Sequence, residues 1–182
     1  MAVTKIWAIH DSVSRVVEYC SNSEKTRLTD LEQVLIYAAN KAKTLDEGEQ
    51  SYAVSGVNCT HDTAIREMTA TQKRFGKTGG NVAYHAYQSF KTGEVSAAEC
   101  HQIGLETARR LWGDNYQVFV ATHFNTGTYH NHFVVNSVGM WDGKKLELNY
   151  FNETRKQELD KMIADFSDEG CMFVEDMFTE FN

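Results

Sequence analysis

Apolar residues recur along the chain with two different periods, and these periods predict its secondary structure. Alternation of apolar with polar or small residues indicates a strand, and apolar residues three or four positions apart indicate a helix. The resulting order is strand, helices, strand, helix, strand, helix, strand, strand, helix. The strands are predicted at 3–9, 51–58, 82–90, 116–123 and 131–138, and the helices at 12–20, about 29–40, 60–75, 96–112 and 152–166.

Turn signals and short connections indicate how these elements are joined. Ser96 supplies a side-chain oxygen that caps the helix after it. The loop from Phe124 to Tyr129 is short enough to make the strands on either side of it antiparallel, and Asp142–Gly143 marks a tight turn after the last strand. No linker or low-complexity tract interrupts the pattern. Residues 1–182 are therefore interpreted as one domain of the α+β class, a single sheet packed by helices.

Composition narrows the class of protein. With 182 residues and 42% hydrophobic content, the chain has enough apolar material for one compact core. No apolar run approaches the length that crosses a bilayer, and the opening MAVTKIWAIHDS becomes polar too early for a signal peptide. The four cysteines are widely spaced and lack the close pairing of zinc ribbons or redox motifs. We therefore expect a soluble intracellular protein with reduced thiols and no membrane segment.

Charge is distributed unevenly along the chain. The formal net charge is −7, and the segment from Gln157 onward accounts for all of it, with eight acidic residues and one base, Lys161. The 156 residues before that segment balance at 17 basic and 17 acidic residues. Three basic clusters stand out in this balanced part: Lys73, Arg74 and Lys77; Arg109 and Arg110; and Lys144 and Lys145. Such clusters indicate either a basic face for an anionic partner or ordinary solvated side chains.

Three of the seven histidines, His123, His130 and His132, fall within ten residues. Side chains alternate across a strand, so His130 and His132 project from one face. The loop before them can return the chain so that His123, at the end of the neighbouring strand, lies beside them. Three neutral imidazoles on one face predict a metal site with open positions for water or substrate. The competing interpretation is that all three are strand-end and loop histidines bonded to nearby backbone.

The histidine block carries a family resemblance that covers most of the chain. The pattern His123-x6-His130-x-His132 followed by FVVNSV resembles the third motif of conjugative relaxases of the MOBP type, mobilisation nucleases of the HUH superfamily. Further blocks resemble this family in order and spacing up to about Lys145: AVTKIW, YCSNSEKT, VSGVNC, TQKRFGK, AYHAYQSF, GEVSAAECHQIG and LWGD. The resemblance implies the HUH-nuclease architecture, a mainly antiparallel sheet of the ferredoxin-like or RRM-like kind.

The resemblance also implies a reaction. A tyrosine nicks one DNA strand at an origin of transfer, stays linked to the 5' phosphate, and so begins conjugative mobilisation of a plasmid or integrative element in the bacterial cytoplasm. The family's tyrosine motif matches VVEYCSNSEKT, which makes Tyr19 the expected nucleophile and Tyr37 its competitor. A phenol with a pKa of about 10 needs activation. A divalent ion, Mg2+ or Mn2+ with Zn2+ as the alternative, is the expected cofactor on the three histidines.

The family's second motif resembles AYHAYQSF followed by Gly93–Glu94. In this motif His85, Gln88 and Ser89 are expected to contact phosphate or orient the site, and Glu94 to stand behind the histidines as a carboxylate. Asn125 is expected beside the histidines, at a position where many relaxases have an acid. Asn136 shares the histidine face and either orients a ligand or phosphate or is a core asparagine. A structural role is the alternative for each of these residues.

The expected partners are single-stranded origin DNA and, with it, accessory relaxosome proteins and a coupling protein. DNA contacts are predicted at Lys73, Arg74, Lys77, Gln88, Ser89, Lys144 and Lys145. Tyr84, Tyr87, Phe90 and Trp141 either stack on bases or pack in the core.

Most such relaxases are longer and have basic C-terminal regions, whereas this chain ends in an acidic segment at about 157–182. It is interpreted as an isolated relaxase domain or a reduced family member. Two other functions stay open: a three-histidine metallohydrolase of a small molecule, and a catalytically inactive DNA-binding relative.

Overall fold

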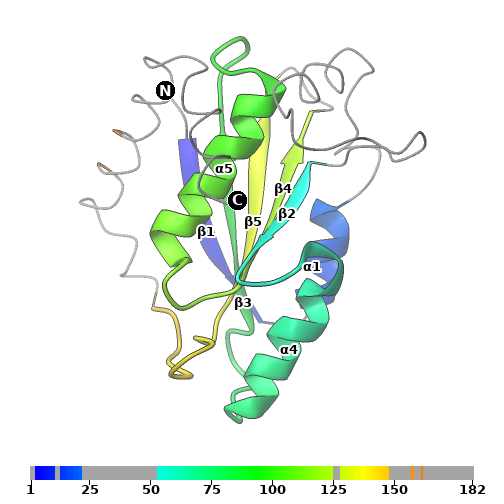
Figure 1. Cartoon of the computed structure of the whole chain (residues 1–182), viewed down its shortest axis with the longest axis vertical. Coiled ribbons are helices and arrows are strands. Elements are labelled where there is room, and N and C mark those ends of the chain that lie inside the picture. The colour runs from blue at the N-terminus through cyan, green and yellow to red at the C-terminus, as the bar shows by residue number, and fades with distance from the viewer. Residues whose placement is uncertain are drawn as a thin grey trace, which may run out of the picture.

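A five-stranded antiparallel sheet forms the centre of the molecule (Figure 1). The computed structural model describes residues 3–10, 13–21, 53–124 and 128–147, together with positions 157 and 161. Within these residues the strand order is β1-β3-β5-β4-β2, and every neighbouring pair is antiparallel. The strands are β1 (Val3–Ile9), β2 (Val54–Val57), β3 (Ala83–Ser89), β4 (Val118–His123) and β5 (His130–Asn136). The predicted α+β class with a mainly antiparallel sheet is confirmed.

Helices cover both faces of the sheet. Helix α5 (Ala97–Trp112) crosses one face, in front in Figure 1, and its Trp112 ring packs against Phe133 of β5, with centroids 5.6 Å apart. Helices α1 (Val13–Cys20) and α4 (Ala64–Arg74) pack on the other face. A short 3-10 helix, η1 (His61–Thr63), precedes α4. The helices predicted at about 29–40 and 152–166 lie outside the described residues. None of the helices that the structure describes is long and apolar enough to cross a bilayer.

Helix α5 begins where the sequence predicts. Ser96 Oγ accepts a hydrogen bond from the backbone N–H of Glu99, and the Glu99 carboxylate accepts one from the backbone N–H of Ser96. This reciprocal pair satisfies two of the N–H groups that a helix start leaves without partners, and a cap of this kind is worth about 1 kcal/mol. The predicted cap at Ser96 is confirmed.

Several predicted elements differ from the structure at their ends, and two of these differences are instructive. Strand β2 stops at Val57, because Asn58 takes a left-handed backbone conformation with φ of 57°. The Asn58 amide then donates to the carbonyl oxygens of Gly113 and Tyr116, at 2.6 and 2.9 Å. The helix predicted at 60–75 begins with η1 and becomes α-helical only at residue 64. The turn predicted at Asp142–Gly143 is confirmed by a β-bridge between residues 138 and 145.

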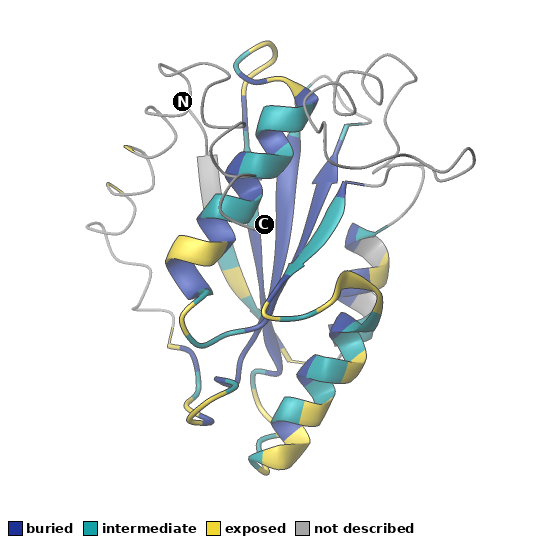
Figure 2. Ribbon diagram, in the orientation of Figure 1, coloured by how far each residue is buried: buried dark blue, intermediate teal, exposed yellow. Residues whose placement is uncertain are grey.

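The central strands are buried on both faces, as Figure 2 shows for β5 and β4. Polar residues on these strands must therefore find partners inside the protein. On the α5 face the carboxamide of Asn131 does so, because its nitrogen donates to Gln88 Oε1 and to the Cys100 carbonyl, and its oxygen accepts from Thr122 Oγ1. The side chains of His130 and His132 lie on the opposite face of β5.

Candidate metal centre

Strand register brings the three histidines together. His123 on β4 is paired with His130 on β5, and His132 lies two residues further along β5, opposite Ala121. All three side chains are buried on the face covered by α1 and α4. One nitrogen from each ring lies within 4.8 Å of the other two, and the ring centroids of His123 and His132 are 4.3 Å apart. The cluster has the geometry that strand alternation predicts.

Hydrogen bonds to backbone carbonyl groups indicate which nitrogen of His123 and of His130 carries the electron pair. Nε2 of His123 lies 2.6 Å from the carbonyl oxygen of Cys20, and Nδ1 of His130 lies 3.1 Å from that of Thr128. A carbonyl oxygen can only accept, so both ring nitrogens donate. A neutral imidazole has one donor and one acceptor nitrogen, which leaves Nδ1 of His123 and Nε2 of His130 as electron-pair donors.

His132 is oriented by a fourth histidine. Its Nδ1 lies 2.8 Å from Nε2 of His85 on β3, and the two rings are stacked with centroids 5.0 Å apart. Burial, together with the neighbouring His123, lowers the pKa of His85 to about 4, so its ring is neutral at pH 7. If Nδ1–H of His132 donates to Nε2 of His85, the electron pair of the His132 ring is on Nε2, which is the atom that would bind a metal. His85 therefore stands where an acid or carbonyl commonly holds a metal-binding histidine.

The helix that carries Tyr19 contacts this cluster. Cys20, the last residue of α1, bonds to His123 through its carbonyl oxygen, so the main chain of Tyr19 adjoins the histidines. The thiol sulfur of Cys20 also lies 3.6 Å from Nε2 of His85. Tyr37, the competing nucleophile, and Asn125, expected beside the histidines, lie outside the described residues.

The structure gives local partners for Glu94 and Asn136. The Glu94 carboxylate accepts from the backbone N–H of Lys91 in the turn after β3, whereas the group next to Nδ1 of His132 is Nε2 of His85. The role expected for Glu94 stays a prediction. Asn136 shares the histidine face but stands at the other end of β5. Its carboxamide bonds to Gln72 and Gln117 in the core, which matches the core interpretation of this residue.

One of the predicted DNA contacts, Gln88, lies inside the protein. Gln88 is fully buried under α5, where its amide donates to Thr107 Oγ1 and its carbonyl accepts from Asn131. Strand alternation turns it away from His85, and the sequence does not say which side of that strand a helix covers. Ser89, on the opposite side of the strand, is half-buried and paired with His130.

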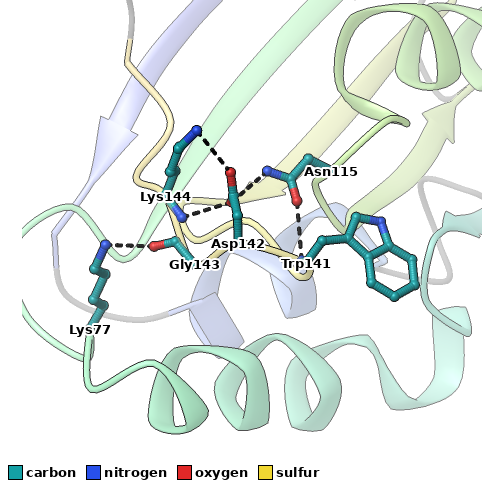
Figure 3. A network of polar contacts seen from close by, with 6 residues as sticks. All are labelled: Lys77, Asn115, Trp141, Asp142, Gly143 and Lys144. Carbon is teal, nitrogen blue, oxygen red and sulfur yellow. Dashed lines mark hydrogen bonds and ion pairs between the residues drawn. The ribbon is translucent and has the colours of Figure 1, made fainter.

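The predicted basic contacts lie far from the histidines. Lys77 donates to the Gly143 carbonyl, which brings the end of α4 to the turn that carries Lys144, as Figure 3 shows. Lys145 bonds to the carbonyl oxygen of Asn81, next to the end of β3 opposite to His130. Six residues of β5 separate the two ends, which is roughly 20 Å at about 3.3 Å per residue. Lys73 and Arg74, in the last turn of α4, belong to this far group.

The aromatic residues named from the sequence fall into two groups. Tyr84 and Phe90 are buried in the α5 core, whereas Tyr87 is half-buried and its ring centroid lies 5.2 Å from that of His130. Trp141 is exposed and belongs to the far turn (Figure 3). Trp7, which no sequence pattern singles out, packs edge-on against His85 with a centroid distance of 4.5 Å. This contact depends on the pairing of β1 with β3, which places Trp7 opposite His85 and cannot be read from the sequence.

An antiparallel α+β domain with three imidazoles on one face of its sheet defines a class of candidate metal-dependent proteins. A family model described as "Relaxase: MobA/VirD2-like, nuclease domain" matches residues 37–166. The chain therefore belongs to the MobA/VirD2-like relaxases and carries their nuclease domain. Relaxases of this family normally use a divalent metal ion, and the histidine cluster is a place where this chain could hold one.

Individual relatives agree with this assignment. The chain is 44% identical over 101 residues to the Rlx protein of Staphylococcus aureus, a match that covers 56% of this chain and 31% of that protein. It is 26% identical over 179 residues to the group II intron-interrupted relaxase LtrB of Lactococcus lactis subsp. cremoris strain MG1363, covering 81% of this chain and 31% of LtrB. The chain thus spans about a third of the length of these relatives.

A solved structure shares the fold. It is described as "Molecular Basis of Vancomycin Resistance Transfer in Staphylococcus aureus", and it matches with a TM-score of 0.55 over 90% of this chain and 88% of that chain. At 13% sequence identity, the likeness concerns the fold alone.

Proposed function

We propose that this domain nicks one strand of DNA at an origin of transfer and transfers that strand through a covalent phosphotyrosine, with Tyr19 as the nucleophile. The observation that carries the proposal is the hydrogen bond from His123 to the Cys20 carbonyl, because it joins the end of α1 to the three clustered imidazoles. Membership of the relaxase family supports the choice of substrate. In a conjugative system, this nick would begin mobilisation of the strand.

The reaction exchanges one ester for another. The phenolic oxygen of Tyr19 forms a bond to phosphorus, the bond from phosphorus to the 3' oxygen breaks, and the strand keeps a free 3' hydroxyl. The phenol loses its proton to solvent and the departing 3' oxygen takes one up, so protons balance. Attack by a 3' hydroxyl on the phosphotyrosine reverses these changes and rejoins the strand.

The three histidines fit a divalent ion. Each ring has one nitrogen next to a hydrogen-bonding group, and its electron pair is then on the other nitrogen, which is the arrangement that orients imidazole ligands in metal sites. Three nitrogen donors suit Zn2+ or another transition-metal ion better than Mg2+, which prefers oxygen. When bound, such an ion would polarise the scissile phosphate and offset the charge that develops in the transition state.

Trp7 gives the site a candidate contact for a base. Its side chain stays 43% exposed although its ring packs edge-on against His85. An exposed aromatic ring beside a reaction centre offers a stacking surface for a base, worth about 1–3 kcal/mol. The lysines at the far end of the sheet are too distant to touch the same phosphate, so we assign them to flanking DNA.

The test is formation of a covalent adduct. The domain would be incubated with Mn2+ and a pool of single-stranded oligonucleotides from the element that carries its gene, and adducts would be separated on a denaturing gel. We expect an adduct with the wild type and with Tyr37→Phe, and none with Tyr19→Phe or with EDTA. No adduct with any oligonucleotide would overturn the proposal, and cleavage that survives both substitutions would favour a metallohydrolase.

A further inference from the structure

A second group of potential metal ligands lies directly behind the first. Cys20 at the end of α1, His85 on β3 and His132 on β5 bring one ligand atom each to within 4.8 Å of one another. Cys20 is fully buried, and His85 and His132 are 7% and 6% exposed. The group comes from three separate elements, which meet only in the folded chain, and it shares His132 with the three-histidine cluster.

The distances in this group are close to those that a tetrahedral ion requires. With Zn–S of about 2.3 Å and Zn–N of about 2.0–2.1 Å, a tetrahedral site separates sulfur from nitrogen by roughly 3.5 Å and two nitrogens by roughly 3.3 Å. Cys20 Sγ lies 3.6 Å from His85 Nε2, and that nitrogen lies 2.8 Å from His132 Nδ1. The two imidazoles need to part by only about half an ångström.

We propose that Cys20, His85 and His132 form a second metal site, selective for a thiophilic ion such as Zn2+. The sulfur sets the selectivity, because thiolate ligands favour Zn2+ and Cu+, whereas Mg2+ and Mn2+ favour oxygen. Binding releases the Cys20 thiol proton to solvent and leaves the fourth coordination position to water. The site does not depend on nicking activity.

The shared ring makes the two sites exclude each other. A neutral imidazole offers a lone pair on only one of its nitrogens. In the three-histidine site, His132 binds through Nε2 and its Nδ1–H donates to His85. In the second site, Nδ1 of His132 is itself the ligand, so Nε2 carries the hydrogen and cannot bind a metal. An ion in the second site therefore removes one of three ligands from the first.

A regulatory consequence follows, and it rests on the proposed function. Zinc at the second site would inhibit nicking supported by Mn2+, because His132 cannot serve both ions. It would also tie the end of α1, next to Tyr19, to strands β3 and β5. Nicking would then respond to the concentration of thiophilic metal ions, because Cys20, the residue after the proposed nucleophile Tyr19, binds them.

Cobalt spectroscopy tests the site without reference to activity. Co2+ bound to a thiolate gives an intense near-ultraviolet charge-transfer band. The variants would be Cys20→Ser, His85→Gln and the matched control Cys100→Ser, which changes a buried cysteine on the α5 face, each checked for folding by circular dichroism. We expect the band in the wild type and in Cys100→Ser, and its loss in Cys20→Ser and in His85→Gln. A band of unchanged intensity in folded Cys20→Ser, or no band in the wild type, would overturn the proposal.

Inhibition provides the second measurement. Nicking in Mn2+ would be titrated with Zn2+, and each variant would be compared with its own rate without zinc. We expect the zinc concentration for half-inhibition to rise at least about tenfold in Cys20→Ser relative to the wild type and to Cys100→Ser. Equal inhibition of all three would overturn the regulatory role. Absence of nicking in every sample would overturn the proposed function and leave the cobalt band to decide the metal site.

Discussion

Nε2 of His123 lies 2.6 Å from the carbonyl oxygen of Cys20, the residue after Tyr19. This single contact does two things, because it orients the His123 ring with the electron pair on Nδ1 and it holds the last turn of α1 against β4. The orientation of a candidate metal ligand and the position of the proposed nucleophile are thus set by the same bond.

Removal of that ring should affect both metal and DNA chemistry. We expect His123→Ala to lower Mn2+ affinity and nicking by at least about 100-fold, since even the outer partners of a metal ligand are worth 10–100-fold. Calorimetric Mn2+ titration and adduct yield measure the two effects. The control is His61→Ala, which changes an exposed histidine at η1. Equal losses in both variants would mean that the cluster has no special role.

Affinity for a metal should depend on the acceptor nitrogen that His85 offers to His132. In His85→Leu the buried Nδ1–H of His132 loses its acceptor, and we expect Mn2+ affinity to fall by about 10–100-fold. His85→Gln keeps an acceptor oxygen in the same region, so its loss should be smaller. The same calorimetric titration checks both. If the leucine variant binds Mn2+ as tightly as the wild type, His85 does not position His132.

The histidine site shows which features of the structure can be predicted from the sequence and which cannot. The meeting of His123, His130 and His132 follows from strand alternation and one short loop, which are local properties of residues 117–138. The bonds that orient the rings come from Cys20 and His85, which are distant in sequence. No periodicity reveals that α1 ends against β4 or that β3 pairs with β5.

The same limit explains why the burial of Gln88 is not visible in the sequence. Alternation places Gln88 on the opposite side of β3 from His85, but only the packing of α5 shows that its side is buried. Likewise, the basic clusters are visible in the sequence, whereas their distance from the histidines depends on which end of the sheet each connection reaches.

A close contact on the α5 face predicts a loss of stability. A methyl group at Gly104 would come 2.7 Å from Cγ of Asn131, a side chain held in place by Thr122, Gln88 and Cys100. We expect Gly104→Ala to lower the free energy of unfolding by about 1–2 kcal/mol, because overpacking outweighs the gain in helix propensity. Urea unfolding measures it. Gly79→Ala, with nothing within 4 Å of its added methyl, is the control and should show no such loss.

His101 should make stability depend on pH. Ser55 Oγ lies 2.9 Å from its Nε2 and Thr122 Oγ1 lies 2.7 Å from its Nδ1, and burial lowers its pKa to about 4 from 6.5. Below pH 6.5 the unfolded chain takes up this proton before the folded chain does. The contribution to stability is therefore complete above pH 6.5 and is lost as the pH falls toward 4, by up to about 3 kcal/mol. His101→Gln should flatten that part of the profile in thermal unfolding; an unchanged slope would contradict it.

Replacement of the two neighbouring lysines Lys144 and Lys145 should have different effects on the stability of the fold. Nζ of Lys145 donates to the carbonyl oxygens of Gly79 and Asn81 and to Ser137 Oγ, so Lys145→Ala should lower the free energy of unfolding by about 1–2 kcal/mol. The side chain of Lys144 is 80% exposed, and its ion pair within the described residues is with Asp142, at 3.4 Å (Figure 3). Lys144→Ala should leave thermal unfolding unchanged. Equal melting temperatures for the two variants would contradict this distinction.

The place of β5 in the sheet has a dynamic consequence. It is the middle strand, with β3 and β4 bonded along its two edges. Each of its bonded amide hydrogens points to β3 or to β4, so exchange with solvent requires one of these two inner ladders to open, which costs more than fraying of an edge or a loop. His130 and His132 are therefore built on a strand that is expected to open rarely. Adjustment to a bound strand must come from α1, which approaches the histidines from outside the sheet.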